Sequence, residues 1–271
     1  NSLLQYEYVG RFIYLFVFLL SIFSISDLLK NKTLKPIFQI LLTLICYDRF
    51  LFGGYQDILL FSILIFLSKY FYIYMKNEDR KILFLCFILL NFLPWIKNEG
   101  YLLLGVFTLS QLMLIKLFKK KLDIIIFILF SICFVIIKNY IFYKYLNVNP
   151  THGANLDFVF KTEQLIEFFF LLFQGVIIAI FKYKIWIFIL LAIFYGIKNI
   201  HLFKKDKNYF YFLILNLIMY SSLIFIIYFN YLDEQRGLYW WIHTTLDRLL
   251  YSISGFFVIL TIMVINFNKI H

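Results

Sequence analysis

Three short polar segments interrupt an otherwise apolar chain, and each holds residue types that bind charged groups. The first runs Gly53-Gly54-Tyr55-Gln56-Asp57, where two glycines permit a tight turn and Asp57 opens a long apolar stretch. An aspartate at this position caps a helix and suits the positive end of its dipole. Its carboxylate could also coordinate a cation or orient a sugar or phosphate group, and one side chain can serve both purposes.

The second segment, Lys97-Asn98-Glu99, separates two apolar stretches by only a few residues. Charges this near the hydrocarbon are costly, so they generally face one another or a cavity. One interpretation is a Lys97–Glu99 pair that extends to the lipid headgroups. The other is that Lys97 binds an anionic lipid phosphate while Glu99 holds it in place.

The third segment leads into the last apolar stretch and contains His243, Asp247 and Arg248, preceded by Trp240 and Trp241. Tryptophans gather at membrane–water interfaces, so we expect these two to be anchors. Asp247 can cap the helix or pair with Arg248. If Arg248 faces inward, its planar guanidinium can hold a phosphate through two parallel N–H donors.

Other polar residues carry weaker signals. Arg11 lies within the first apolar run, Asp48 and Arg49 form an adjacent pair, and His152 lies in the longest loop. The three cysteines all lie inside apolar runs, without metal-ligand spacing or a disulfide partner in a loop. The chain lacks a Gly-rich nucleotide loop and the CxxC, HExxH and GxSxG motifs, so we expect neither a dedicated metal site nor soluble-nucleotide chemistry.

The elements that position these segments are expected to be transmembrane helices. The 271-residue chain is 63% hydrophobic and 15% charged, with a mean hydropathy of +0.86, whereas soluble domains are about 25% charged. Only helices fit, because a segment in lipid must satisfy its own backbone hydrogen bonds and period-2 alternation is absent. The apolar runs are Val9–Leu29, Pro36–Phe52, Ile58–Met75, Ile82–Ile96, Tyr101–Phe118, Leu122–Tyr143, Gln164–Phe181, Ile185–Phe203, Tyr209–Phe229 and Leu246–Phe267.

The distribution of Lys and Arg predicts the orientation. If every run crosses except Gln164–Phe181, which would lie along the interface, more than half of the 26 basic residues collect on one side. If Gln164–Phe181 crosses as well, this bias weakens. We therefore predict an all-α polytopic bundle with about nine crossings and one interfacial helix. The net charge of +11 then reflects a cytoplasmic face rather than nucleic-acid binding, and the polar segments face outward.

The three segments, in this order, resemble the GT-C superfamily of membrane glycosyltransferases, in particular its protein O-mannosyltransferase and aminoarabinose-transferase branch. Bacterial relatives carry a Gly-Tyr-x-Asp that opens a helix, a Lys-Asn-Glu-Gly at an outer hairpin and a Thr/Ser-x-Asp-Arg-x-Leu at a late helix. The corresponding stretches here are Gly54-Tyr55-Gln56-Asp57, Lys97-Asn98-Glu99-Gly100 and Thr245-Leu246-Asp247-Arg248-Leu249-Leu250. Glu7-Tyr8-Val9-Gly10-Arg11 also resembles a family stretch, and the similarity covers roughly residues 7–118 and 238–265.

The resemblance implies that a sugar moves from a polyprenyl-phosphate donor to a glycan, lipid or protein acceptor. The reaction would take place at the extracytoplasmic face, and the resemblance implies the face of a bacterial inner membrane. The resemblance implies no particular cofactor, and a divalent cation remains an alternative. The residues implied are Asp57 for catalysis, Lys97, Glu99 and Arg248 for the donor phosphate, and Tyr55, Asp247 and His243 in accessory positions.

GT-C enzymes carry their principal catalytic aspartate in a first outer loop, which here would precede residue 1. We therefore expect residues 1–271 to be a single transmembrane domain, the C-terminal portion of a larger GT-C-like domain, and inactive alone. Two alternatives remain: a transporter or flippase for lipid-linked or small solutes, and a non-catalytic membrane scaffold. The transferase hypothesis requires Asp57, Lys97 and Arg248 to lie together on the face away from the cytosol.

Overall fold

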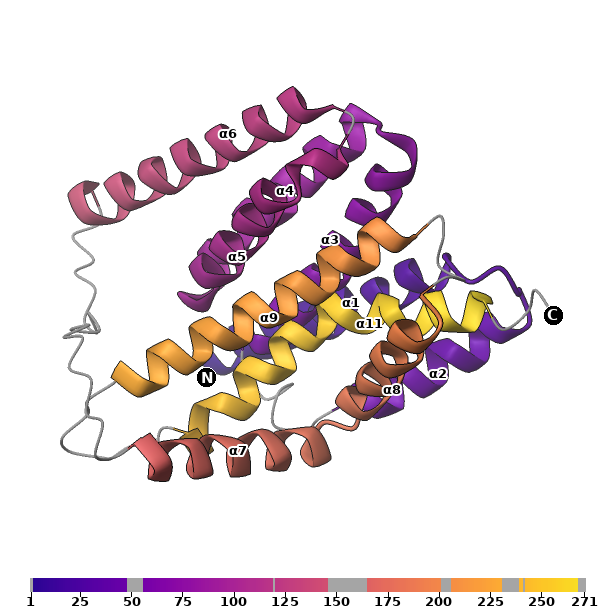
Figure 1. The fold of residues 1–271 in the computed structure, drawn as a ribbon. Coiled ribbons are helices and arrows are strands. Elements are labelled where there is room, and N and C mark those ends of the chain that lie inside the picture. Colours follow the sequence, from indigo (N-terminus) through magenta and orange to yellow (C-terminus); the bar gives the residue numbers. More distant parts are fainter. Residues whose placement is uncertain are drawn as a thin grey trace.

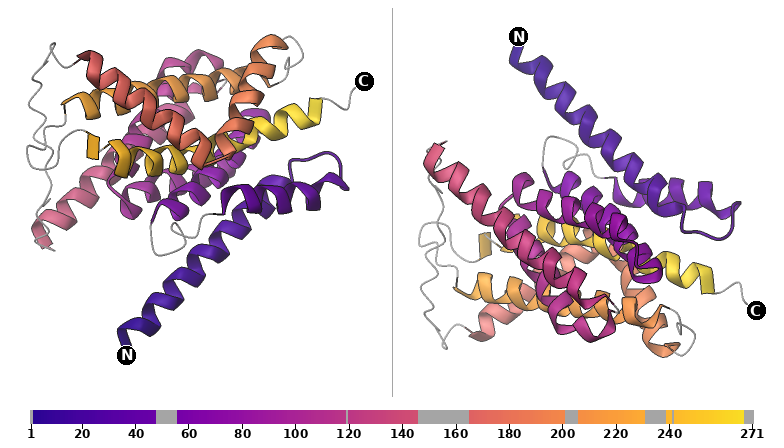
Figure 2. Two further views of the ribbon diagram at one scale, coloured as in Figure 1. Left: turned by 90° about the horizontal axis from the view of Figure 1, so that it is seen from below. Right: turned by 90° about the horizontal axis from the view of Figure 1, so that it is seen from above.

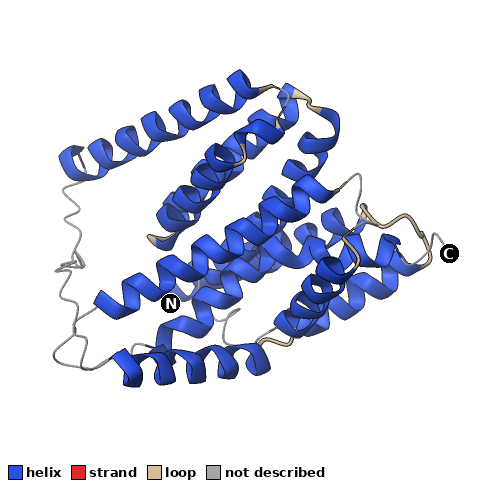
Figure 3. Ribbon diagram, in the orientation of Figure 1, coloured by secondary structure: helices blue, strands red, loops and turns tan. Residues whose placement is uncertain are grey.

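Every regular element in the described part of this computed structural model is a helix (Figures 1 and 3). The structure describes residues 2–47, 56–118, 120–145, 165–200, 206–230, 239–240 and 242–267. Within these ranges the all-α prediction is confirmed. Tyr55, the Asp48–Arg49 pair and His152 lie outside the described residues.

The helices coincide closely with the apolar runs of the sequence. Most helix ends lie within a few residues of the run, because charged or turn-forming residues bound each run. However, α1 begins seven residues before its run and α2 ends six residues before the end of its run. The helices are α1 (Ser2–Ser26), α2 (Leu34–Cys46), α3 (Asp57–Asn77), α4 (Arg80–Ile96), α5 (Glu99–Met113), α6 (Lys121–Tyr140), α7 (Leu165–Lys182), α8 (Ile185–Lys198), α9 (Lys207–Asn230) and α11 (Asp247–Phe267). Three short helical turns accompany these helices. Turn η2 (Ile115–Leu117) follows α5, η3 (Ile141–Tyr145) extends α6, and η5 (Ile242–Leu246) precedes α11.

Helix α3 occupies the centre of the bundle, where it packs against α1, α4 and α11 (Figures 1 and 2). Its side chains are apolar around most of its circumference, and such a helix is stable when it is buried on all sides. Its most extensive contact is with α11, where Gly255 lies against the backbone carbonyl of Phe61. A small residue at a helix crossing lets two backbones approach closely in membrane proteins.

Among the described residues, four helices are long and apolar enough to cross a membrane, or five if the bent pair α7–α8 is one span. The four are α3, α6, the Lys207–Tyr228 part of α9, and the continuous Ile242–Phe267 segment. The nine predicted crossings are therefore not confirmed. Several apolar runs form helices of only 13 to 17 residues, namely α2, α4, α5 and α8. A straight span needs about 20 residues, so length alone does not let each of these cross.

Helix α7 was predicted to lie along the interface, and its geometry allows another arrangement. It meets α8 at a bend of 102°, so the pair forms either one broken span or a re-entrant loop. An interfacial helix has a strongly charged face, whereas α7 is apolar and leaves Phe170, Phe173 and Phe181 about 70% exposed. Exposed side chains of this kind, together with the long apolar helices, fit a membrane protein.

Candidate functional site

The candidate site is centred on Asp57, the first residue of the central helix α3. Its side chain is 0% exposed, although it carries a carboxylate. A buried carboxylate is costly unless its oxygens are hydrogen-bonded and its charge is compensated. Both conditions are met by side chains from the turn after α4 and from α11, and the positive N-terminal end of α3 adds a favourable field.

Arg248, the second residue of α11, supplies the first cation. Its Nε and Nη2 atoms donate to Asp57 Oδ2 at 2.9 and 2.7 Å. Ser252, one helical turn further along α11, places its hydroxyl 3.2 Å from Asp57 Oδ1 and 3.0 Å from the Arg248 carbonyl oxygen. The start of α11 is thereby fixed to the start of α3.

Lys97 supplies the second cation from the turn between α4 and α5. Its ammonium lies 3.0 Å from Asp57 Oδ1 and 2.9 Å from Glu99 Oε1. The side chains of Lys97, Glu99 and Arg248 are 20%, 28% and 29% exposed, while that of Asp57 is inaccessible. The two cations therefore lie between the buried carboxylate and the surface.

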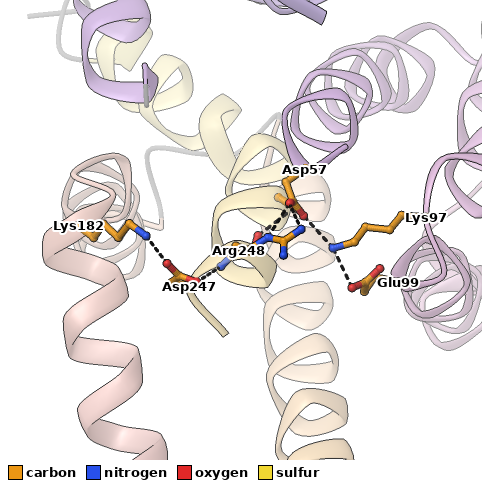
Figure 4. A network of polar contacts seen from close by, with 7 residues as sticks. Asp57, Lys97, Glu99, Lys182, Asp247 and Arg248 are labelled. Carbon is orange, nitrogen blue, oxygen red and sulfur yellow. Dashed lines mark hydrogen bonds and ion pairs between the residues drawn. The ribbon is translucent and has the colours of Figure 1, made fainter. Parts of the chain in front are cut away.

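Asp247 extends the network toward α7. Its Oδ1 accepts a hydrogen bond from the Arg248 backbone N–H at 2.7 Å, and its Oδ2 pairs with Lys182. Lys182 is the last residue of α7, where a cation also suits the negative end of the helix dipole. Figure 4 shows the resulting alternation of charges from Lys182 through Arg248 and Asp57 to Glu99.

The turn that carries Lys97 is held from outside by α6. Lys138 is buried among the rings of Trp95, Tyr101 and Phe142, with its ammonium 4.4 to 5.7 Å from their centroids. The same ammonium donates to the carbonyl oxygen of Pro94. This carbonyl belongs to the last turn of α4, where carbonyl groups lack partners within the helix, so Lys138 caps the helix from its neighbour.

The structure brings five of the seven sequence-predicted site residues together. Asp57, Lys97, Glu99, Asp247 and Arg248 lie in one hydrogen-bonded network.

His243 lies one helical turn before Asp247, in the π-helical turn η5, and its ring is 4.1 Å from that of Tyr239. Its buried Nε2 has no hydrogen-bond partner among the described residues. Tyr55 belongs to the undescribed part of the chain, so its accessory role stays a prediction.

Ser252, Lys182 and Lys138 were not identified from the sequence. Ser252 could have been found, because it lies four residues after Arg248 and therefore on the same helix face. Lys182 offered only the signal of a cation directly after an apolar run, and Lys138 only that of a cation inside one.

The network favours the binding of an anion over that of a metal ion. Asp57 faces two cationic side chains, which occupy the space a metal ion would need. Among the described residues, no group of three or more His, Cys, Asp or Glu side chains could hold a metal ion. Lys97 and Arg248 instead place two cationic side chains at the edge of the site, which suits a phosphate.

The comparisons with known proteins identify no relative, since no family model, no curated protein and no solved structure matches this chain.

Proposed function

We propose that this chain binds the phosphate of a polyprenyl-phosphate sugar and belongs to a membrane glycosyltransferase of the GT-C type. The observation that carries the proposal is the meeting of Lys97 and Arg248 over the buried Asp57 carboxylate. Each comes from one of the three segments that resemble the family motifs. The chain would use about nine crossings.

The two polar ends of α3 support this topology. From Asp57 to Asn77 the helix has 21 residues, or roughly 30 Å, which is one hydrocarbon thickness. Basic residues collect beyond the Asn77 end, so the positive-inside rule assigns that end to the cytoplasm. The Asp57 network then faces the extracytoplasmic side, where a lipid-linked sugar would be used.

In the proposed reaction, the acceptor oxygen forms a bond to the anomeric carbon while the bond from that carbon to the phosphate oxygen breaks. Negative charge develops on the departing lipid phosphate, and preplaced cations stabilise it. Lys97 and Arg248 supply that charge. The resemblance implies a further carboxylate that takes the acceptor's proton. Asp57, whose oxygens are held by Lys97 and Arg248, positions these two cations.

Binding of a polyprenyl monophosphate tests the proposal without requiring turnover. The chain in lipid nanodiscs should bind this probe more tightly than the matching polyprenol, which has the same tail and no phosphate. Arg248→Gln should weaken binding of the phosphate at least tenfold, because charge-assisted hydrogen bonds to an anion contribute about 1.5–3 kcal/mol. Lys184→Gln, at an exposed cation after α7, is the matched control and should bind like the wild type.

Two outcomes would contradict the proposal. Equal affinity for the phosphate and the alcohol would show that the site does not recognise the anion. An unchanged affinity in a correctly inserted Arg248→Gln variant would remove the phosphate-binding role of Arg248. In a protein that also contains the outer-loop carboxylate, Lys97→Ala and Arg248→Ala should abolish sugar transfer.

A transporter or flippase is the second candidate, and the α7–α8 bend favours it. Broken helices form substrate sites in many secondary transporters, and Lys182 at this break contacts Asp247 of the network. Reconstituted chains that move a fluorescent polyprenyl phosphate between leaflets, but do not retain it, would support this candidate over the transferase.

A further inference from the structure

A second feature lies on the opposite side of α4 from the central bundle. Helices α4 and α6 enclose an open cleft of about 460 Å³, a volume typical of ligand sites. Its walls are apolar and largely aromatic. The phenylalanines that line it are Phe84, Phe87, Phe127, Phe130 and Phe134.

The floor of the cleft is well packed, whereas its rim is open. Phe127 is 4% exposed and its ring meets that of Phe87 edge-on at 5.6 Å. On the rim, Phe84 and Phe130 are more than 60% exposed. The cleft is therefore a defined trough that opens sideways, toward the lipid that would surround α6.

One end of the trough is polar. Arg80, the first residue of α4, donates through Nε and Nη2 to the two carboxylate oxygens of Asp123 in the first turn of α6, at 2.9 and 3.1 Å. The Arg80 side chain remains 76% exposed. Two of its five N–H donors are used in this pair, so the guanidinium can bind a second anion from the other edge.

The charge around this mouth favours an anion. Residues 78–81 and 120–123, which flank it, contain four Lys or Arg and three Asp or Glu residues. Asp79 accepts from the Lys81 backbone N–H, and Asp123 pairs with Arg80. Both α4 and α6 also begin here and direct the positive ends of their dipoles to the mouth.

We propose that this cleft binds one anionic phospholipid, with an acyl chain in the phenylalanine trough and the phosphate beside Arg80. From Asp123 to Ile137 the trough follows α6 for roughly 21 Å, so a flexible tail can lie in it while the headgroup stays at the surface. A helix from a second copy fits less well, because helix packing in lipid favours small residues and this trough has bulky aromatic walls. The proposal does not depend on the glycosyltransferase function.

Cys133 provides a local probe, because it lines the cleft and is exposed, whereas Cys46 and Cys86 are buried. A fluorophore attached to Cys133 is measured in nanodiscs that contain small amounts of nitroxide-tailed phosphatidylglycerol or phosphatidylcholine. The anionic lipid should quench it several-fold more strongly. In the control, Cys133→Ser with Phe194→Cys places the label on a 70% exposed position of α8, where both lipids should quench equally.

Two variants at the mouth should change the preference in opposite directions. Arg80→Gln should reduce the preference for phosphatidylglycerol about fivefold, since one cation near an anionic headgroup contributes about that factor. Asp123→Asn should increase it, because the Arg80 guanidinium is released from its carboxylate. Retention of phosphatidylglycerol by the unlabelled protein, counted by native mass spectrometry, should follow the same order.

The proposal is overturned if the two lipids quench equally at Cys133 or if Arg80→Gln leaves the preference intact. It is also overturned if labels on Cys133 quench one another between copies of the chain, because a second protein copy would then fill the cleft.

Discussion

The two ends of α3 both carry ion pairs, but they are built differently. At the Asp57 end, one inaccessible carboxylate holds cations that lie 40 and 191 positions away along the chain. At the other end, Lys76 pairs with Asp206 at 2.9 Å, and the Lys76 side chain is 44% exposed. That pair lines a pocket of only about 60 Å³.

The difference separates two uses of charge in a membrane protein. A buried ion cluster is a weak source of net stability, because desolvation offsets most of the attraction. A cluster that gathers three distant segments around one carboxylate is therefore better explained by the position it gives to its cations. Exposed cations at the other end need no such explanation, since the positive-inside rule accounts for them.

Asp57→Asn should show the largest effect of any single change discussed here. It leaves Arg248 and Lys97 without their shared carboxylate, and breaking a buried ion pair costs about 3–5 kcal/mol. Asp206→Asn is the matched variant at the other end. The Asp206 carboxylate is 10% exposed but its cation is 44% exposed, so we expect a smaller loss than for Asp57→Asn.

Thermal or SDS-induced unfolding of both variants in the same micelles measures this contrast. Equal losses at the two ends would remove the distinction drawn between them. A larger loss for Asp206→Asn would show that the Asp206 pair, and not the Asp57 network, is the more important buried ion pair of α3.

Gly255→Ala tests whether the approach of α11 to α3 supports the Asp57 network. A Cβ at Gly255 would clash with the backbone carbonyl of Phe61, so α11 must shift. Overpacking of this kind costs about 1–3 kcal/mol. We also expect weaker binding of polyprenyl monophosphate, because the shift moves Arg248 relative to Asp57.

Gly105→Ala is the control, since a Cβ at Gly105 meets no heavy atom within 4 Å. Alanine has the higher helix propensity, so this variant should gain up to about 1 kcal/mol. If Gly255→Ala loses stability but binds normally, the helix contact is structural and does not set the geometry of the site.

The sequence predicted local features of the site well. Asp57, Glu99 and Asp247 each begin a helix, as expected from acidic residues that directly precede or open an apolar run. The expectation that Asp57, Lys97 and Arg248 lie together is confirmed by their hydrogen bonds. The order of polar and apolar segments was sufficient for this, because consecutive helices bring alternate turns to the same end.

Packing between helices was not predictable in the same way. The bend between α7 and α8 and the contact of Lys182 with Asp247 depend on how two apolar surfaces fit, and an apolar run contains little information about that. The number of membrane crossings could not be predicted from the sequence for a related reason. Hydropathy identifies apolar helices, but a short helix packed in a bundle and a membrane span share the same composition.

The smallest predicted effect concerns Asp27, which lies just after α1 and pairs with two lysines. Lys35 and Lys69 place their ammonium groups 3.0 and 3.5 Å from its carboxylate oxygens. Burial raises the pKa of Asp27, but the hydrogen bond and charge of Lys35 and the charge of Lys69 outweigh it and leave the pKa below its ordinary value.

A lowered carboxyl pKa stabilises the folded state above the ordinary value of about 3.9, and this contribution disappears as the pH falls through the lowered pKa. The Asp27 side chain is 60% exposed, so screening by solvent limits the contribution to less than about 1 kcal/mol. Asp27→Asn should therefore lower the free energy of unfolding slightly at neutral pH and match the wild type in strong acid. A loss that is the same at every pH would show that Asp27 acts through packing, and the Asp57 network would then be the clearer example of positioned charge.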